Sequence, residues 1–173
     1  ISTIPFTNKS LANERDKLTS YKDITTYNNY YEFGTSKGDP YRNSQIFKTS
    51  PWDISIEGEV EKPIKLSMEE ISEMFVSEER IYRLRCVEGW SMVIPWMGFS
   101  LSELLSKVNP TNKAKFVEFE SVYDPAQMKG QRYPVLNWPY NEGLRIDEAM
   151  HPLTTVVTGL YGKKLPNQNG APF

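Results

Sequence analysis

The chain has 173 residues, 39% hydrophobic and 24% charged, a composition typical of one globular domain. Its 20 Lys and Arg residues against 22 Asp and Glu residues give a net charge of −2, which excludes a strongly basic nucleic-acid-binding protein. The single cysteine and single histidine exclude an internal disulfide, a CxxC metal site, a thiolate-held iron–sulfur cluster and an HExxH protease. Any metal or cofactor must therefore be held by few protein ligands.

The N-terminal part of the chain differs in character from the rest of the sequence. Residues 1–26 are polar with scattered apolar side chains, which predicts an extended arm with one short helical turn over Ala12–Lys17. Residues 27–33 are rich in Tyr and Asn, and glycine-containing turn signals come next at 34 and 38. We therefore divide the chain into an arm over 1–26 and a domain over 27–173 that begins with a polar loop.

Two strand-and-helix pairs are expected in the first half of that domain. Alternation of apolar and polar residues predicts a strand over 52–59 and a second over 80–87. Ser67 with Glu70 forms a capping-box pattern for a helix that runs to Phe75. Ser100 with Glu103 repeats that pattern before a second helix, which ends at Asn109-Pro110.

In the second half of the domain, the sequence predicts fewer regular elements. Alternation indicates a strand over 115–122, and β-branched residues indicate another over 154–160. Residues 123–143 contain three prolines and predict a long irregular loop, while 147–150 predict one helical turn. Strands with short helices between them indicate an α+β fold.

Three side chains are candidates for chemistry, each with an ordinary structural alternative. Cys86 lies near the end of a predicted strand and offers a thiolate as nucleophile or soft metal ligand, or else is a small buried hydrophobe. Glu88 could relay protons or orient a substrate, or else is a solvated carboxylate in a turn. His151 is either a base or ligand, or a histidine that caps a turn.

Two polar segments are candidates for ligand binding. The loop Asn28–Glu32 offers amide, phenol and carboxylate groups, with a packed aromatic loop as the alternative. The segment Asn167–Gly170 offers amides, with an ordinary turn as the alternative. Neither matches a Gly-rich phosphate loop of the Walker or dinucleotide type.

Taken together, five segments resemble one enzyme family in the same order along the chain: residues 27–34, 79–92, 93–99, 147–153 and 168–172. The family is that of the catalytic subunits of bacterial periplasmic protein-methionine-sulfoxide reductases, molybdopterin enzymes with the sulfite oxidase fold. The resemblance extends over nearly the whole chain from about Tyr21, and the segment around Cys86 is its most specific part. It implies an α+β, sulfite oxidase-type molybdopterin-binding fold.

The resemblance also implies roles for individual residues and a Mo-molybdopterin cofactor. Cys86 matches the cysteine whose thiolate binds molybdenum. The residues that match cofactor contacts are Asn28, Tyr31, Glu32, Ser121 and Asn169. Ser121 stands where the family pattern has Thr and keeps the hydroxyl group.

One departure from the family pattern lies at the C-terminal end. The pattern continues past Ala171-Pro172 with an Arg and a Lys-Tyr-Gly segment that help to hold the pterin phosphate, whereas this chain stops at Phe173. The resemblance therefore implies a domain that is incomplete at its C-terminus and a cofactor pocket that lacks these contacts.

The implied function is molybdenum-dependent reduction of methionine sulfoxide residues in oxidised periplasmic proteins. The implied partners are those protein substrates and a membrane haem-binding subunit that donates electrons, with no nucleic acid. The implied location is the periplasm, although the chain itself carries no signal peptide. The alternatives are a sulfite-oxidase-like oxidoreductase acting on another small S- or N-oxide, and a binding module without cofactor.

Overall fold

The computed structural model describes residues 8–10 and 16–173. Its strands are β1 (Asn8–Ser10), β2 (Asp53–Ile56), β3 (Ile64–Ser67), β4 (Glu78–Arg85), β5 (Ser91–Ser100), β6 (Phe116–Glu120), β7 (Asn141–Arg145), β8 (Thr155–Leu160) and β9 (Lys163–Lys164). Its α-helices are α1 (Tyr21–Thr26), α2 (Asp39–Asn43), α3 (Met68–Met74), α4 (Leu101–Val108) and α5 (Ile146–Ala149). Short 3₁₀-helices are η1 (Tyr31–Phe33), η2 (Ser44–Ile46), η3 (Lys129–Arg132) and η4 (Asn167–Asn169).

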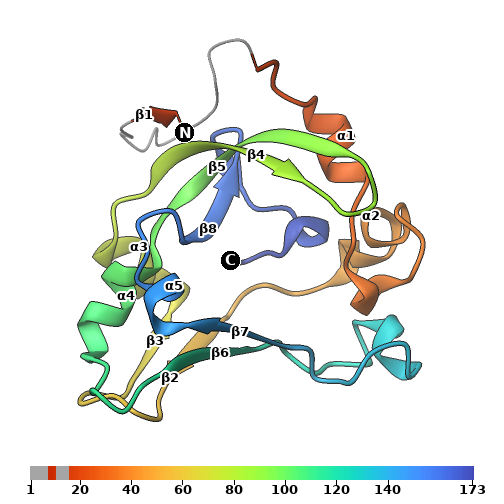
Figure 1. The fold of residues 1–173 in the computed structure, drawn as a ribbon. Helices are drawn as coiled ribbons and strands as arrows, with labels where there is room; N and C mark the ends of the chain where they lie inside the picture. The colour runs from red at the N-terminus through yellow and green to blue at the C-terminus, as the bar shows by residue number, and fades with distance from the viewer. Residues whose placement is uncertain (1–7, 11–15) are drawn as a thin grey trace.

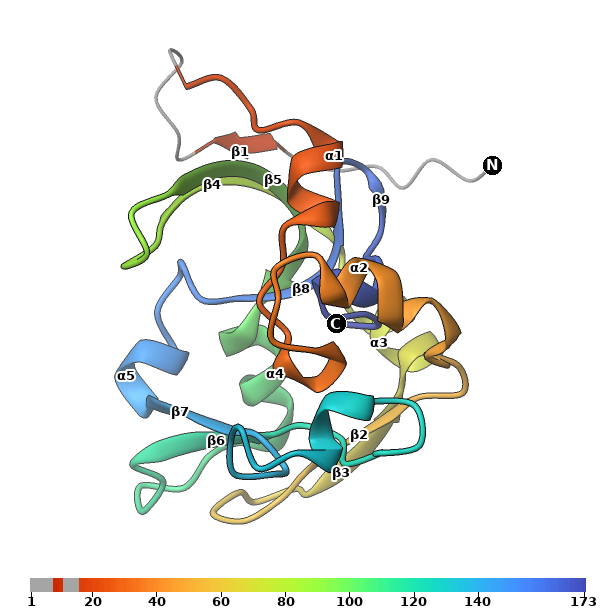
Figure 2. The ribbon, with the colours of Figure 1, turned by 90° about the vertical axis from the view of Figure 1, so that its right-hand side faces the viewer.

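The strands of the described residues form one larger sheet and two hairpin-like pairs. The larger sheet has the order β1-β4-β5-β8-β9, with β1 parallel to β4 and the other pairs antiparallel. The pairs β2–β3 and β6–β7 are antiparallel. Figures 1 and 2 show the β4–β5 hairpin curving over the upper part of the molecule and the two small strand pairs at the bottom. Helices α4 and α5 lie between that hairpin and the small pairs.

Apolar side chains fill the space between these layers. The apolar stripe of α4 is fully buried, and Leu104 and Leu105 pack with Phe75 and Phe99, whose rings are stacked 4.3 Å apart. A second cluster joins α1 to the larger sheet, because Ile24 and Leu160 are both almost completely buried in it. Among the described residues, no helix is long and apolar enough to cross a lipid bilayer.

Several elements lie where the sequence predicts them, within about two residues. The helix after Ser67 forms with its capping box, and the strands expected over 80–87, 115–122 and 154–160 are β4, β6 and β8. The helical turn expected over 147–150 is α5. The strand expected over 52–59 is shorter, because the chain turns at Gly58, where φ is +93°.

The prediction of a second capping box, at Ser100, is wrong, although the helix expected after it forms as α4. Ser100 makes no side-chain capping hydrogen bond to that helix. Its hydroxyl oxygen instead accepts a hydrogen bond from Nη2 of the buried Arg80 at 2.8 Å. Because Ser100 is also the last residue of β5, a tertiary contact takes the hydroxyl that the local pattern assigns to the helix.

The central strand β5 was not expected, because Pro95 lies inside it. Consecutive residues of a strand direct their backbone groups to opposite neighbours. The Pro95 carbonyl accepts a hydrogen bond from the Tyr161 backbone N–H, so the side on which proline lacks a donor faces away from β4. The ladder of eight residue pairs between β4 and β5 is therefore continuous through this proline.

Three other expectations concern the N-terminal arm and the long loop over 123–143. Residues 21–26 of the arm form α1, capped by Ser20 and packed into the core through Ile24. The loop over 123–143 contains η3, and its end begins β7, which pairs with β6. Most of the helical turn expected over Ala12–Lys17 lies outside the described residues.

Candidate functional site

Cys86 is the first residue after β4, at the start of the turn that connects this strand to β5. Its backbone N–H donates to the Trp90 carbonyl at 2.9 Å, and its carbonyl accepts from the Gly89 N–H at 3.0 Å. Gly89 has φ of +85°, a backbone conformation that glycine adopts without strain. The thiol is free and the residue is only partly buried, so the interpretation of Cys86 as a small buried hydrophobe is wrong.

A hollow of about 330 Å³ opens beside this turn. The residues that line it are Arg83, Arg85, Cys86, Gly89, Trp90 and Ser91. Arg83 is ion-paired with Asp16. The hollow therefore combines the only thiol of the chain with two guanidinium groups. Groups of three or more His, Cys, Asp and Glu side chains that could hold a metal are absent from the described residues.

Glu88 extends from the same turn and has both carboxylate oxygens engaged. Oε1 accepts a hydrogen bond from the Lys37 ammonium at 2.8 Å, and Oε2 accepts one from Nε1 of Trp90 at 2.9 Å. These hydrogen bonds, from Lys37 first and then Trp90, lower the pKa of the Glu88 carboxyl below its usual value. Glu88 is therefore an ionised, anchored carboxylate in this structure.

The loop that starts at Asn28 lies next to that turn. The Lys37 carbonyl accepts from the Asn28 backbone N–H at 2.9 Å, which closes the base of the loop. The Asn28 side chain is buried and donates through Nδ2 to the Ile24 carbonyl at 3.0 Å. Its Oδ1 is also buried and has no hydrogen-bond partner.

Tyr31 and Glu32 come next, in η1. Tyr31 is half-buried, whereas Glu32 is only 9% exposed. Burial raises the pKa of the Glu32 carboxyl, partly opposed by a backbone hydrogen bond that stabilises its ionised form. The carbonyls of both residues pack against Gly130 of η3, where a Cβ atom would lie 1.9 Å from the Tyr31 oxygen.

Asn169 comes from the other end of the chain and meets the Asn28 segment. Its Nδ2 donates to the same Ile24 carbonyl at 3.2 Å, and its Oδ1 is buried without a partner. The next residue, Gly170, lies against the Tyr30 phenol, where a Cβ atom would be 2.4 Å from the hydroxyl oxygen. One backbone carbonyl therefore brings together two predicted cofactor contacts from remote parts of the chain.

Ser121 joins this group only indirectly. It lies just after β6, is half-buried, and its N–H donates to the Tyr140 carbonyl at 2.9 Å. The neighbouring Val122 carbonyl accepts from Nε2 of the buried Gln131, which lies in η3 beside Gly130. The structure thus links Ser121 to η1 through η3.

His151 hydrogen-bonds within its own turn, as the structural alternative to a base or ligand predicted. Its Nδ1 accepts a hydrogen bond from the Leu153 N–H at 3.1 Å, within the turn after α5. Its backbone N–H donates to the Glu148 carbonyl at 3.1 Å. His151 therefore stabilises a turn.

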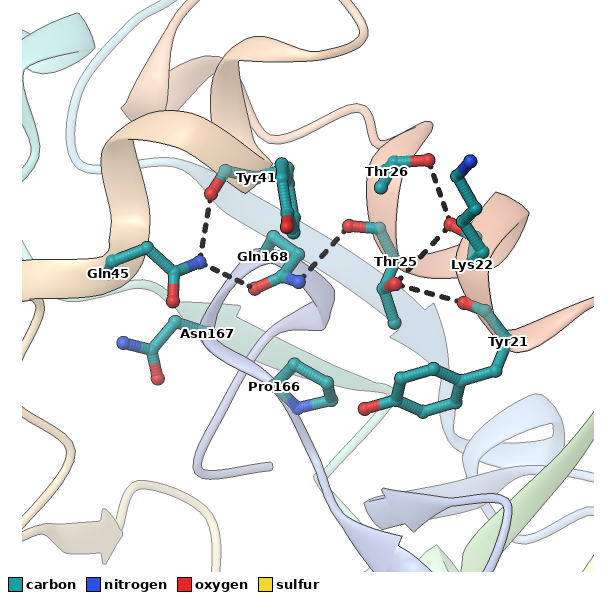
Figure 3. A pocket seen from close by; sticks show the side chains of 9 residues that line it. All are labelled: Tyr21, Lys22, Thr25, Thr26, Tyr41, Gln45, Pro166, Asn167 and Gln168. Carbon is teal, nitrogen blue, oxygen red and sulfur yellow. Dashed lines mark hydrogen bonds between the residues drawn. The ribbon is translucent and has the colours of Figure 1, made fainter.

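A second hollow, of about 730 Å³, is lined by residues of α1, α2, η2 and η4, whose side chains Figure 3 shows. Its lining residues are Tyr21, Lys22, Thr25, Thr26, Tyr41, Gln45, Pro166, Asn167 and Gln168. Gln168 is buried and donates to the Thr25 carbonyl at 3.1 Å. Asn167 and Gln168 of the candidate segment Asn167–Gly170 thus line this hollow, whereas Cys86, Glu88 and the residues matched to cofactor contacts do not.

Sequence reasoning missed the residues that hold the site together. Contacts between segments that are remote in sequence are made by Lys37, Trp90, Gly130 and the Ile24 carbonyl. Trp90 lies in the segment that carries the resemblance but shows no chemical pattern of its own. A backbone carbonyl has no sequence signature at all, so no pattern could have indicated Ile24.

Comparisons with known proteins agree with the resemblance. Residues 41–173 match the family model described as oxidoreductase molybdopterin binding domain. Relatives named protein-methionine-sulfoxide reductase catalytic subunit MsrP are 60% identical in Xanthomonas axonopodis pv. citri and 57% identical in Burkholderia mallei. Each alignment covers 91% of this chain but 49% and 47% of the relative, so the chain spans about half the length of these proteins.

A solved structure confirms the fold class. The crystal structure of the sulfane dehydrogenase SoxCD from Paracoccus pantotrophus matches with a TM-score of 0.57 at 15% sequence identity. The match covers 80% of this chain and 35% of the SoxCD chain. The fold is thus the expected α+β, sulfite oxidase-like molybdopterin-binding fold. Because the family model matches most of its length, the chain belongs to the oxidoreductase molybdopterin binding domain family.

Proposed function

We propose that this chain is the molybdopterin-binding part of a reductase that converts methionine sulfoxide residues in proteins to methionine. The observation that carries the proposal is the free thiol of the partly buried Cys86, held in a closed turn beside a hollow. The high identity to relatives that are named methionine-sulfoxide reductases supports the choice of substrate.

The residues present fit a Mo-molybdopterin cofactor in their chemistry. A soft thiolate suits molybdenum, and Cys86 is the only thiol that the chain offers. The buried, unpartnered Oδ1 atoms of Asn28 and Asn169 can accept N–H groups of a pterin. A buried acceptor without a donor is costly, so a ligand that supplies one would gain free energy there.

The proposed roles are taken from the resemblance, residue by residue. Cys86 would hold molybdenum, and the residues that would contact the pterin part are Asn28, Tyr31, Glu32, Ser121 and Asn169. When bound, the cofactor supplies the oxygen-atom transfer, and the protein supplies position and electrostatics. The overall change consumes two electrons and two protons and releases methionine and water.

Glu88 belongs to the proposed site as an ionised group rather than a proton donor in the conformation described. Its ion pair with Lys37 favours the carboxylate, so a relay of protons would first require that the hydrogen bond to Lys37 opens. We propose that Glu88 orients the Cys86 turn and, at the rim of the hollow, the substrate.

We propose further that the whole protein works in the periplasm on oxidised proteins, with a membrane haem-binding subunit as electron donor. The words "catalytic subunit" in the relatives' names support the existence of a partner subunit. The resemblance supports the location and the haem.

Replacement of the thiol tests the proposal. In the whole protein, Cys86→Ser should remove most of the molybdenum and abolish turnover of an oxidised, methionine-rich protein. Ser106→Ala, which removes a hydroxyl bonded to the Ser102 carbonyl on the remote helix α4, is the control and should change neither quantity. Full turnover in the Cys86→Ser protein would end the proposal.

The same protein preparation separates the substrate classes. Sulfite, a small N-oxide and an oxidised protein should be offered in parallel, with turnover expected only for the oxidised protein and related sulfoxides. Turnover of sulfite or the N-oxide alone would replace the proposal with a sulfite-oxidase-like activity. If the wild-type protein binds no molybdenum, the alternative of a binding module without cofactor would replace the proposal.

A further inference from the structure

We propose that Lys37 is a positioning residue that fixes the Cys86 turn against the loop beginning at Asn28. Its ammonium group lies between a carboxylate of the turn and an amide of the loop. The consequence for catalysis depends on the proposed function, but the positioning itself is a property of this chain.

The ammonium group of Lys37 connects the two segments directly. Its Nζ donates to Glu88 Oε1 at 2.8 Å and to Asn29 Oδ1 at 2.7 Å. The Lys37 side chain is only 25% exposed, less than the 41% of Glu88. A lysine with two donors committed in this way links the turn and the loop through one group.

Each end of this link is rigidly tied to a predicted site residue. In the turn, hydrogen bonds from Cys86 to Trp90 and from Gly89 to Cys86 close the backbone around Glu88. In the loop, the Asn28 N–H donates to the Lys37 carbonyl, so the lysine also closes the segment that carries Asn28. The Lys37–Glu88 contact therefore connects the segment that carries Cys86 to the segment that carries Asn28.

A second contact joins the turn to Tyr27, the residue just before the loop, so the link is not an isolated ion pair. The rings of Tyr27 and Trp90 lie edge to face, with centroids 5.7 Å apart. Trp90 also donates to the second oxygen of Glu88. The carboxylate thus receives one hydrogen bond from the turn itself and one from the loop, which fixes its orientation.

The competing interpretation is an ordinary partly exposed salt bridge. Such pairs contribute little to global stability. Global stability alone therefore cannot distinguish the two interpretations. They differ in the local order of the Cys86 turn, which only the positioning role requires.

The single cysteine makes that local order measurable without any cofactor. A nitroxide spin label attached to Cys86 in this chain reports the mobility of the turn by electron paramagnetic resonance. Lys37→Met should shorten the rotational correlation time of the label several-fold while the melting temperature stays within a few degrees. Lys37→Arg, which keeps two or more donors, should restore the wild-type spectrum.

A matched control removes a comparable ion pair elsewhere. Lys65 and Asp53 pair at 2.9 Å between β3 and β2, and Lys65→Met should leave the spectrum of the label unchanged. Glu88→Gln should mobilise the label as Lys37→Met does, and the double variant should be no more mobile than either one. Should Lys37→Met fail to fold, Glu88→Gln and Asn29→Ala decide the question by the same measurement.

Two results would overturn the proposal: an unchanged spectrum in folded Lys37→Met, or an equal change in Lys65→Met. In the whole protein, the positioning role also predicts a lower kcat for Lys37→Met at unchanged KM, with rescue by Lys37→Arg. The spin-label experiment needs neither cofactor nor turnover. Its failure would therefore leave the proposed reductase function standing, and the loss of that function would leave the positioning role standing.

Discussion

Glu32, in η1, is a carboxyl group whose pKa is changed by its buried position. Its side chain is buried, and burial raises the pKa of its carboxyl because the charged form loses hydration. A carboxyl whose pKa is higher in the folded than in the unfolded state holds more protons when folded. Stability therefore falls as pH rises from the unfolded pKa through the folded pKa, the reverse of the usual carboxylate.

Replacement of Glu32 by Gln should remove that pH dependence. In the cofactor-free chain, Glu32→Gln should raise the free energy of unfolding at pH 7, because the amide carries no charge to desolvate. Near pH 4 and below, where the native carboxyl is protonated, the difference should shrink towards zero. Urea unfolding at both pH values measures it.

The control for this experiment is Glu73→Gln on the exposed face of α3. Because this side chain is exposed, the substitution should change the unfolding free energy by no more than about 0.5 kcal/mol. A Glu32→Gln chain that is less stable than wild type at pH 7 would show that the ionised carboxylate is stabilised by contacts that outweigh its burial.

At the scale of elements, α3 and α4 show that the same local pattern can have two outcomes. The Glu70 N–H donates to Ser67 Oγ at 3.2 Å and the Ser67 N–H donates to Glu70 Oε2 at 2.8 Å, which is a complete capping box. At Ser100 the hydroxyl is taken by Arg80 instead. Ser100 therefore contributes to the sheet rather than to the start of α4.

A pair of double-mutant cycles should detect this difference. Ser67→Ala should cost about 1 kcal/mol of unfolding free energy, as for other lost caps. Combined with Glu70→Ala, it should show a coupling energy of roughly 0.5 kcal/mol or more, because the two side chains act together.

The matched cycle uses Ser100→Ala and Glu103→Ala in α4. These two substitutions should be additive, because Ser100 makes no capping hydrogen bond in this structure. Urea denaturation measures both cycles. A coupling energy in α4 as large as that in α3 would contradict the contact between Ser100 and Arg80.

At the scale of the whole molecule, the proposed site depends on close packing between segments that are remote in sequence. The clearest case is Gly130 in η3, which lies against the backbone of η1. A Cβ atom at this position would be 1.9 Å from the Tyr31 carbonyl oxygen and 2.7 Å from that of Glu32. Backbone atoms cannot move aside as the end of a flexible side chain can, so η3 and η1 would have to separate.

Gly130→Ala should therefore lower the free energy of unfolding by about 1–3 kcal/mol or more, through overpacking. Gly143→Ala in β7 is the matched control, because a Cβ there would lie 3.9 Å from the Val117 carbonyl oxygen, an ordinary contact. That control should stay within about 0.5 kcal/mol of wild type. Equal effects of the two substitutions in urea unfolding would show that η1 and η3 can separate without cost.

The elements that could be predicted from the sequence are those whose cause is local. The stripe of Leu101, Leu104 and Leu105 predicts a helix with one buried face, and the pattern of Ser67 with Glu70 predicts the start of α3. Pro95 concealed β5, because the effect of a proline on a strand depends on which neighbour its missing N–H faces. Strand β7 was missed for a different reason: its residues show no strand pattern of their own, and it forms through its pairing with β6.

For the site, the sequence by itself determined the family and the chemical inventory. A single cysteine within a specific segment limits any thiolate chemistry to Cys86, whatever the fold. Only the tertiary structure decided which groups meet: Asn28 and Asn169 share the Ile24 carbonyl, and Lys37 joins Glu88 to Asn29. These contacts cross long stretches of chain and use backbone acceptors or flexible charged side chains. Neither kind of partner leaves a pattern in sequence, because each is selected by position in space rather than by residue spacing.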